Sequence, residues 1–231
     1  MKKLVLFALM GTAAALTNCS KDETQEVLDT MIAPKITLTF DKDKVEAKEA
    51  KLIIRKLQYD KPKGEAFVDL NGNLKKDVGE ELKSNKEYTV TTESVSILGE
   101  GIQKLYLNPR YSLKAEVTHR NIKSLLIKDQ LLESVVVTNA QSLENLNLST
   151  DADNSLKELV LPDDKQKIAN LKELNIARGF QLPRADVFNR LPDRTGKSPK
   201  GKVKFLSSDK ELSEKEKDIL DGLNWEADFG K

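Results

Sequence analysis

Five side chains that can supply oxygen ligands to a metal ion lie between residues 69 and 80. Their spacing is the ligand spacing of a calcium loop, with oxygens at positions 1, 3, 5, 9 and 12, and hard cations bind several oxygens at once. The spacing therefore makes a calcium ion the cofactor to consider for this chain. The five residues are Asp69, Asn71, Asn73, Asp77 and Glu80.

Other residues of the same segment favour a loop without metal. Position 6 of a calcium loop is usually Gly, because the chain turns sharply there, but this chain has Leu74. Lys75 and Lys76 add positive charge, and the flanking residues have the pattern of strands, whereas an EF-hand has paired helices. In the alternative interpretation, which we favour, the segment is a hairpin loop. Its Asp and Asn side chains then bond to the local backbone, and its Gly residues adopt a positive φ.

Cys19 is the only cysteine of the chain, so it cannot form an internal disulfide. It follows two lysines and the 13-residue apolar run 4–16. A run of this length is too short to span a bilayer, which needs about 20 residues, and it predicts a signal peptide over residues 1–18. The position of Cys19 resembles that of the lipidated cysteine in a bacterial lipobox, although Asn18 replaces the usual small residue. The resemblance implies that the protein is held at a membrane by a lipid on Cys19.

Residues 19–34 contain few aromatic and many charged side chains, which predicts a flexible tether. Residues 20–23, Ser-Lys-Asp-Glu, resemble the short signal that sends such lipoproteins to the outside of the outer membrane. Residues 29–31 resemble the O-glycosylation sequon of Bacteroides, which makes Thr30 a candidate site. These resemblances imply an outer-membrane lipoprotein that faces the cell exterior.

The composition argues against a nucleic-acid partner and against catalysis. The chain has 38 basic and 37 acidic residues, so it has no excess of positive charge for nucleic acid. His119 is the only histidine, the commonest general acid or base, and we expect it to be an inert surface residue. No phosphate loop, nucleophile elbow or zinc motif occurs. The sequence therefore predicts a protein that is not an enzyme.

An apolar pattern repeats six times between residues 102 and 176, with an aliphatic residue at positions 1, 4 and 6 of a short unit. So small a unit cannot bury its apolar side alone, and stacked units form a continuous core. The pattern predicts a leucine-rich repeat solenoid over residues 100–182. The six matches are Ile102-Leu105-Leu107, Ile122-Leu125-Ile127, Leu132-Val135-Val137, Leu143-Leu146-Leu148, Leu156-Leu159-Leu161 and Leu171-Leu174-Ile176.

Position 5 of each unit should point outward, because side chains alternate between the two faces of a strand. If two units make one turn, a degenerate half-turn around Leu113 and Val117 fills the gap between the first two matches. The outward residues then form two rows on opposite sides. Grouped apolar side chains often mark interfaces, so we predict that Tyr106 and Leu126 contact a ligand. One row is Tyr106, Leu126, Asn147 and Asn175, and the other is Val136 and Val160.

Both ends of the repeat region have patterns of their own. Residues 35–99 contain short alternating runs that predict a small antiparallel β-sandwich, which would cap the first repeat. Residues 183–231 predict an α/β cap, with a short helix at 185–191, a strand at 203–206 and a helix that starts at the capping box of Ser213 and Glu216. Trp225 and Phe229 would close over the last repeat. Residues 178–204 are basic and 209–231 are acidic, which would suit an anionic ligand but more simply predicts mutual neutralisation.

The chain from residue 35 onward resembles the leucine-rich repeat lipoproteins of Bacteroidetes, which are related in repeat style to the internalin-like proteins of Porphyromonas. The resemblance rests on residues 67–80 and 88–97, the repeats, residues 191–197 and Asn224-Trp225, although the repeats are few and uneven. It implies a mainly β surface protein for recognition or adhesion, which binds a protein or glycan of a host or bacterial surface through its repeats. It brings no catalytic residue. The alternative is a structural component of the cell envelope or of a multi-lipoprotein complex.

Overall fold

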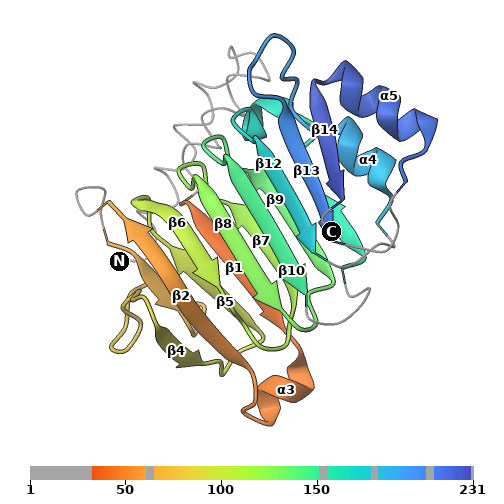
Figure 1. The fold of residues 1–231 in the computed structure, drawn as a ribbon. Helices are drawn as coiled ribbons and strands as arrows, with labels where there is room; N and C mark the ends of the chain where they lie inside the picture. The colour runs from red at the N-terminus through yellow and green to blue at the C-terminus, as the bar shows by residue number, and fades with distance from the viewer. Residues whose placement is uncertain (1–32, 61–64, 151–155, 178–181, 207–210, 230–231) are drawn as a thin grey trace, which may run out of the picture. The chain divides into compact units, whose positions relative to one another are not determined.

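The computed structural model describes residues 33–60, 65–150, 156–177, 182–206 and 211–229. In this part of the chain the protein is mainly β, with two mixed sheets that are not closed (Figure 1). None of the described helices combines the length and the apolar character needed to cross a membrane. The predicted signal peptide, Cys19 and Thr30 lie outside the described residues.

The first sheet has the strand order β11–β9–β7–β1–β5–β3. Its strands are β1 (Lys35–Phe40), β3 (Phe67–Asp69), β5 (Ser94–Leu98), β7 (Ser112–Thr118), β9 (Ser134–Asn139) and β11 (Glu158–Val160). The second sheet has the order β14–β13–β12–β10–β8–β6–β2–β4. Its strands are β2 (Lys51–Tyr59), β4 (Lys86–Thr89), β6 (Ile102–Leu107), β8 (Ser124–Asp129), β10 (Asn145–Thr150), β12 (Glu173–Ala177), β13 (Gly201–Leu206) and β14 (Trp225–Phe229).

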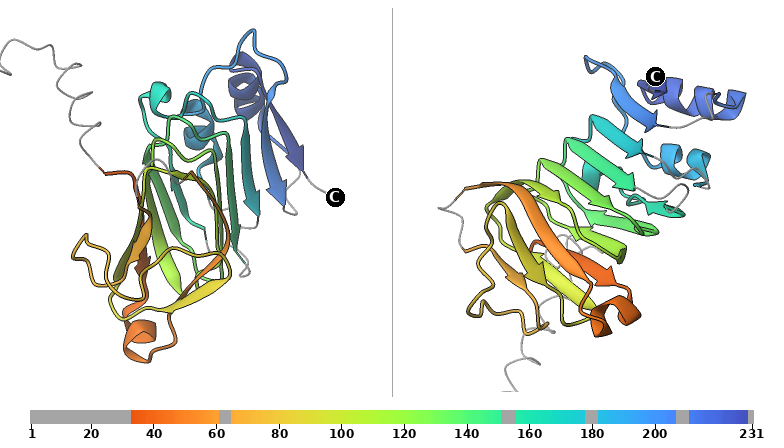
Figure 2. Two further views of the ribbon diagram at one scale, coloured as in Figure 1. Left: turned by 90° about the vertical axis from the view of Figure 1, so that its left-hand side faces the viewer. Right: turned by 60° about the horizontal axis from the view of Figure 1, so that its bottom comes forward.

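The two sheets lie face to face as two layers, and their inward side chains form one apolar core (Figure 2). From β6 to β12 the strands alternate between the sheets, and neighbours within a sheet are parallel. Equivalent repeat residues are in register, as in the row Leu105, Leu125, Leu146 and Leu174. The residues at repeat positions 1, 4 and 6 are all at most 5% exposed, so the prediction that they form the core is confirmed.

Strand β7 occupies the gap in which the sequence predicts a degenerate half-turn. Val117 and Ala115 are buried, whereas Leu113 is partly exposed. Because β7 brings a short alanine where its neighbours bring larger aliphatic residues, its repeat pattern is weak in the sequence. The strand nevertheless pairs in parallel with β9 and keeps the alternation between the sheets.

The N-terminal strands belong to the same two sheets as the repeats. Strand β1 lies antiparallel to both β5 and β7, and β2 lies antiparallel to both β4 and β6. The alternating sequence of β1 buries every second residue, Ile36, Leu38 and Phe40. The first repeat strand of each sheet is therefore covered by an antiparallel neighbour. The short helix α3 (Lys42–Glu46), which Asp41 caps through its carboxylate, connects β1 to β2.

The C-terminal residues continue the second sheet and add two helices. Helix α4 (Arg184–Asn189), strand β13 and helix α5 (Glu214–Gly222) confirm the three predicted elements. The 3-10 helix η2 (Lys165–Ile168) precedes β12. Residues 225–229 also form a strand, β14, parallel to β13, which the sequence analysis did not predict. Trp225 is fully buried and donates a hydrogen bond from its indole Nε1 to the Pro192 carbonyl, 2.8 Å away, and Phe229 stacks on Phe205.

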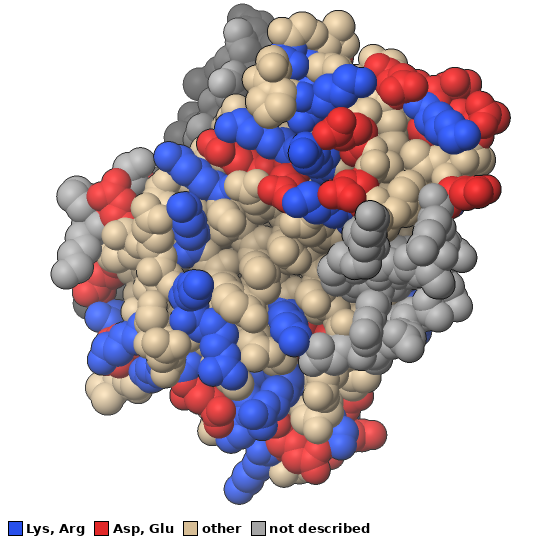
Figure 3. Space-filling view, viewed as in Figure 1, with Lys and Arg blue, Asp and Glu red and all other residues tan. Residues whose placement is uncertain are grey.

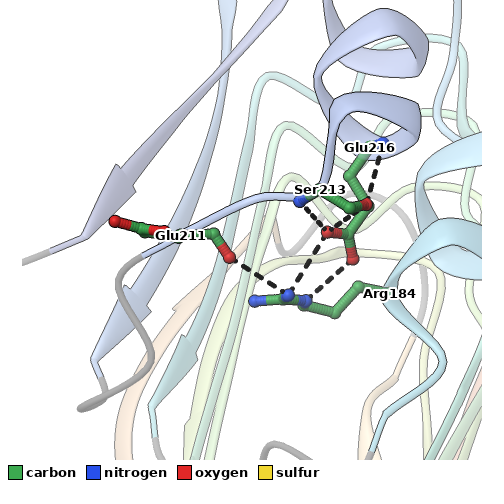
Figure 4. A network of polar contacts seen from close by, with 4 residues as sticks. All are labelled: Arg184, Glu211, Ser213 and Glu216. Atoms are coloured by element: carbon green, nitrogen blue, oxygen red, sulfur yellow. Dashed lines mark hydrogen bonds and ion pairs between the residues drawn. The ribbon is translucent and has the colours of Figure 1, made fainter.

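The capping box at the start of α5 is present and also joins α5 to α4 (Figure 4). The Glu216 carboxylate accepts hydrogen bonds from the Ser213 backbone N–H at 2.8 Å and from Arg184 of α4 at 2.9 and 3.2 Å. Burial raises the pKa of Glu216, but these hydrogen bonds and the charge of Arg184 outweigh it, so the pKa lies below its usual value. Glu216 is therefore held as a carboxylate.

Candidate ligand-binding face

The outward row predicted from position 5 of the repeats exists on the second sheet. Tyr106 is aligned with Leu126, Leu126 with Asn147, and Asn147 with Asn175. All four side chains are partly exposed. Neighbouring rows on a sheet face lie within side-chain reach and so shield one another in part.

The same row continues beyond the repeats at both ends. Lys56 of β2 is aligned with Tyr106 through the antiparallel pairing of β2 and β6. At the other end, Asn175 is aligned with Lys204, and Lys204 with Asp228. The sequence analysis missed Lys56, because a β-bulge at residues 54–56 sets its register against a strand about 50 residues away.

Two further outward rows lie on either side of this one. In the first, Gln58, Lys104, Ser124 and Asn145 are aligned across β2, β6, β8 and β10. In the second, Arg55 donates two hydrogen bonds of 3.3 Å to the side-chain oxygen of Asn108, and Asn108 donates one of 3.0 Å to the Lys128 carbonyl. Lys128 is in turn aligned with Ser149. The three rows define what we call the repeat face, the outward residues of β2, β6, β8 and β10 between residues 55 and 149.

Charge is distributed unevenly over the second sheet. The repeat face has four cations and no carboxylate among its residues, all of which the structure describes; the cations are Arg55, Lys56, Lys104 and Lys128. Figure 3 shows its uncharged centre, with Lys and Arg along the side of β2 and β6 and mixed charges over β12 to β14. The single carboxylate on these four strands, Asp129, is buried, and it accepts hydrogen bonds from Ser112.

On β12, β13 and β14 the outward charges form pairs. Lys204 Nζ lies 2.7 Å from a Glu173 carboxylate oxygen, and Lys202 Nζ lies 3.5 Å from one of Glu226. The hydrogen bond to Glu173 raises the pKa of Lys204, and that from Lys204 lowers the pKa of Glu173. Both groups thus stay charged over a wider pH range. This part of the sheet neutralises its own charge.

Outward polar side chains of the first sheet also pair with one another. Lys157 lies 2.8 Å from the Glu133 carboxylate, and the Ser134 hydroxyl donates to Glu158 at 2.6 Å. Val136 and Val160, the second predicted row, are neighbours in register and partly exposed. They are flanked by paired polar groups, which leaves high strand propensity as the simplest account of these valines.

The loop 69–80 contains the local hydrogen bonds of the hairpin interpretation. Asp69 is buried, and its carboxylate accepts from the backbone N–H groups of Gly72, Asn73 and Leu74 at 2.8 to 3.2 Å. The buried carboxylate of Glu80 accepts from the N–H groups of Leu70 and Asp77, both at 2.8 Å. The amides of Asn71 and Asn73 each donate to Asp77 at 2.7 Å, and these hydrogen bonds lower the pKa of Asp77.

This loop is closed by a single bridge between Phe67 and Glu81, after which the chain crosses from β3 in one sheet to β4 in the other. Leu74 has a φ of +57° and so makes the left-handed turn for which a calcium loop uses Gly. Within the described residues, no group of three or more His, Cys, Asp or Glu side chains lies close enough to hold a metal. Calcium binding stays a prediction: it would raise the melting temperature, and Asp69→Ala with Asp77→Ala would remove the rise.

One further expectation from the sequence is corrected. His119 is fully buried, where we expected a surface residue, and its Nε2 lies 3.0 Å from the Gly99 carbonyl. Burial lowers the pKa of His119. In the basic segment of the C-terminal cap, Arg194 is 5% exposed and bonds to the carbonyls of Leu171 and Pro199, and Arg190 pairs with Asp163 at 3.2 Å. Both arginines thus bind within the protein, but within the described residues neither side chain forms an ion pair with the acidic segment 209–231; an ion pair that joins the two segments is that of Arg184 with Glu216.

No known protein family, curated protein or solved structure matches this chain.

Proposed function

We propose that this protein is a lipid-anchored cell-surface recognition protein, and that its repeat face binds a protein or glycan of a host or neighbouring bacterial surface. In this proposal the strands from β6 onward are a short leucine-rich repeat solenoid. The antiparallel strands β1 to β5 form a sandwich-like cap at its start, and α4, α5 and β14 form an α/β cap at its end. The resemblance to leucine-rich repeat lipoproteins of Bacteroidetes supports this assignment.

The observation that carries the proposal is the outward row through Tyr106 and Leu126. The repeat positions that bear the core are committed to burial, so only the residues between them can reach a partner. Within this row a tyrosine and a leucine lie side by side in register on adjacent parallel strands. A tyrosine combines apolar area with a polar group, and such residues dominate the energetics of interfaces.

The proposal is tested by capture from host-matrix and bacterial surface fractions with the lipid-free protein, residues 20–231. Tyr106→Ala with Leu126→Ala should weaken binding of the captured molecule by roughly 1 kcal/mol or more per residue. The matched control is Val136→Ala with Val160→Ala, because these two valines are also outward neighbours in register, but on the other sheet.

Melting curves of both double variants should match that of the parent, since none of the four residues is in the core. The repeat face would be refuted as the site if both double variants lost binding equally, or if neither variant lost binding. Capture of the cell's own envelope lipoproteins alone would instead favour the alternative function, a structural component of an envelope complex.

The lipid anchor is a separate part of the proposal and depends on Cys19. Cys19→Ala should release the protein from membranes and abolish labelling by a fatty-acid analogue. Protease added to intact cells should degrade the parent protein, and substitution of residues 21–23 should protect it. A parent protein that stays in the membrane without any lipid label would contradict the anchor, whatever the repeat face binds.

A further inference from the structure

Resting on the proposed function, we propose that the ligand of the repeat face is an acidic polysaccharide, a chain of sugars that carries carboxylate or sulfate groups. The first argument is charge. Lys56 and Lys104 are exposed and form no ion pair within the described part of the chain. Arg55 is exposed as well, and its hydrogen bonds go to the neutral amide of Asn108. The face thus presents cations without carboxylates of its own to compete for them.

The unpaired state of these cations is a property of this region and not of the sheet as a whole. On β13 of the same sheet, Lys202 and Lys204 have the same outward orientation but meet Glu226 and Glu173. The alignment across β2, β6, β8 and β10 offers equivalent cross-strand positions, and these hold Ser124, Asn145 and Asn147 instead of acids. A ligand with negative charges would supply the ion-pair partners that Lys56 and Lys104 lack.

The second argument concerns the uncharged side chains between the cations. Tyr106 offers a ring on which the apolar side of a sugar can stack. The amides of Asn145 and Asn147 and the hydroxyls of Ser124 and Ser149 can both donate and accept hydrogen bonds, as sugar hydroxyls do. These groups recur from strand to strand at about 4.8 Å, which is close to the length of one sugar unit in an extended polysaccharide. The repeating sugar units of a polysaccharide would therefore match the spacing of the repeating polar side chains on this face.

A protein ligand is less well suited to the same surface. Extended peptides bind sheets mainly by adding a strand to an edge, where backbone groups are free. Strands β6, β8 and β10 lie in the interior of the second sheet, with a paired strand on both sides. Their outward face offers only side chains, and these are short amides and hydroxyls around one tyrosine and one leucine.

The test measures binding of four polymers of matched length to the lipid-free protein. They are heparin, which carries sulfate and carboxylate, hyaluronate, which carries carboxylate alone, neutral dextran, and poly(glutamic acid). Lys56→Gln with Lys104→Gln is compared with Lys202→Gln with Lys204→Gln. Both variants lose two positive charges from the same sheet, so a general effect of net charge would be equal in the two.

We expect the parent to bind heparin or hyaluronate but not dextran, and the difference between the two acidic polysaccharides tells whether sulfate is needed. In Lys56→Gln with Lys104→Gln, the slope of log affinity against log salt concentration should fall by roughly one for each cation removed. The control variant should keep the slope of the parent. Tyr106→Leu, which keeps an apolar side chain but removes the ring, should also weaken binding of the polysaccharide relative to the parent.

Three outcomes would overturn the proposal. They are failure to bind either acidic polysaccharide, equal loss of binding in the two lysine variants, and binding of poly(glutamic acid) as tight as that of the polysaccharides. The last result would assign the face to acidic protein. If a captured surface molecule still depended on Tyr106 and Leu126 in any of these cases, the recognition function would stand and only the ligand class would be wrong.

Discussion

The second sheet has rows of aligned outward residues from β2 to β14, but charged side chains are arranged differently in its two halves. On β12, β13 and β14, outward lysines meet outward glutamates across neighbouring strands. On β2, β6, β8 and β10, outward Lys56 and Lys104 have amides, hydroxyls and Tyr106 as neighbours. Cross-strand ion pairs are thus compatible with this architecture, and β2 forms one with β4 between Lys51 and Glu87, but Lys56 and Lys104 take part in none within the described part of the chain. In the proposed function, the charges of the two halves serve different purposes, cohesion in one and recognition in the other.

Beneath this difference the two halves share one core. Leu125 under the repeat face and Leu174 under the paired half belong to the same apolar cluster, and both are fully buried. Burial of apolar area dominates the stability of such a protein, so the outer face can vary without changing the fold. The contrast between the halves should therefore affect binding, but hardly affect folding.

The largest expected effect follows from this shared core. Leu125→Ala and Leu174→Ala should each lower the free energy of unfolding by about 2–5 kcal/mol, because each leaves a cavity among buried side chains. Denaturant titration followed by far-UV circular dichroism and by the fluorescence of Trp225 should give one coincident transition in both variants. If Leu125→Ala left the transition seen by Trp225 in place while part of the sheet unfolded, the two halves would be separate folding units and the comparison would need to be recast.

A smaller effect is expected at a position that belongs to the paired half alone. A Cβ at Gly201 would overlap the ring of Trp225, which is buried and held by its bond to Pro192. Gly201→Ala should therefore cost about 1–3 kcal/mol in the free energy of unfolding through overpacking. Gly222→Ala is the matched control, because a Cβ there meets no atom within 4 Å. Binding to the repeat face should be unchanged in both variants, and a loss of binding in Gly201→Ala would show that the halves are coupled.

Local patterns in the sequence were sufficient for the features that depend on neighbouring residues. The repeat positions, the row through Tyr106 and Leu126, and the capping box at Ser213 were all predicted, since a period of two in strands and a four-residue cap are properties of short segments. The structure confirms the burial of the first, the alignment of the second and the hydrogen bonds of the third.

Features that depend on contacts between distant segments were missed. Lys56 joins the row of Tyr106 through a bulged antiparallel pairing that has no signature in the sequence. The burial of Arg194 and His119 depends on carbonyl groups of other segments, which accept hydrogen bonds from these usually exposed side chains. Residues 225–229 form a strand, where the sequence analysis predicts only that Trp225 and Phe229 close over the last repeat.

Acid should weaken two regions of the protein in different pH ranges, the region around His119, which follows β7 of the first sheet, and the region around Glu216 of α5. Burial lowers the pKa of His119 in the folded protein below its ordinary 6.5, so the unfolded chain binds the proton first. Stability is then lost as the pH falls below about 6.5, by at most about 1.4 kcal/mol per pH unit.

Glu216, at the end of the paired half, also has a lowered pKa, from an ordinary value of 4.5, and its contribution is lost only as the pH falls further. Chemical denaturation from pH 7.5 to 3.5 should show a flatter curve near pH 6 for His119→Phe and near pH 4 for Glu216→Gln. If His119→Phe kept the slope near pH 6, that slope would have another origin.

The smallest expected effect is also the most direct test of the contrast between the halves. Lys204→Gln removes the partner of Glu173, which lies 2.7 Å away with 31% of its side chain exposed. Exposed pairs of this kind contribute about 0.2–1 kcal/mol and are screened by salt, so the loss of stability should shrink as ionic strength rises.

Lys56→Gln removes a cation that has no carboxylate beside it, and it should leave the free energy of unfolding unchanged at every salt concentration. A double-mutant cycle of Lys204→Gln with Glu173→Gln, measured at low and high salt, isolates the pair energy from other effects of each change. Were Lys56→Gln to destabilise the protein as much as Lys204→Gln, Lys56 would have a structural role and would no longer be distinguished by its availability to a ligand.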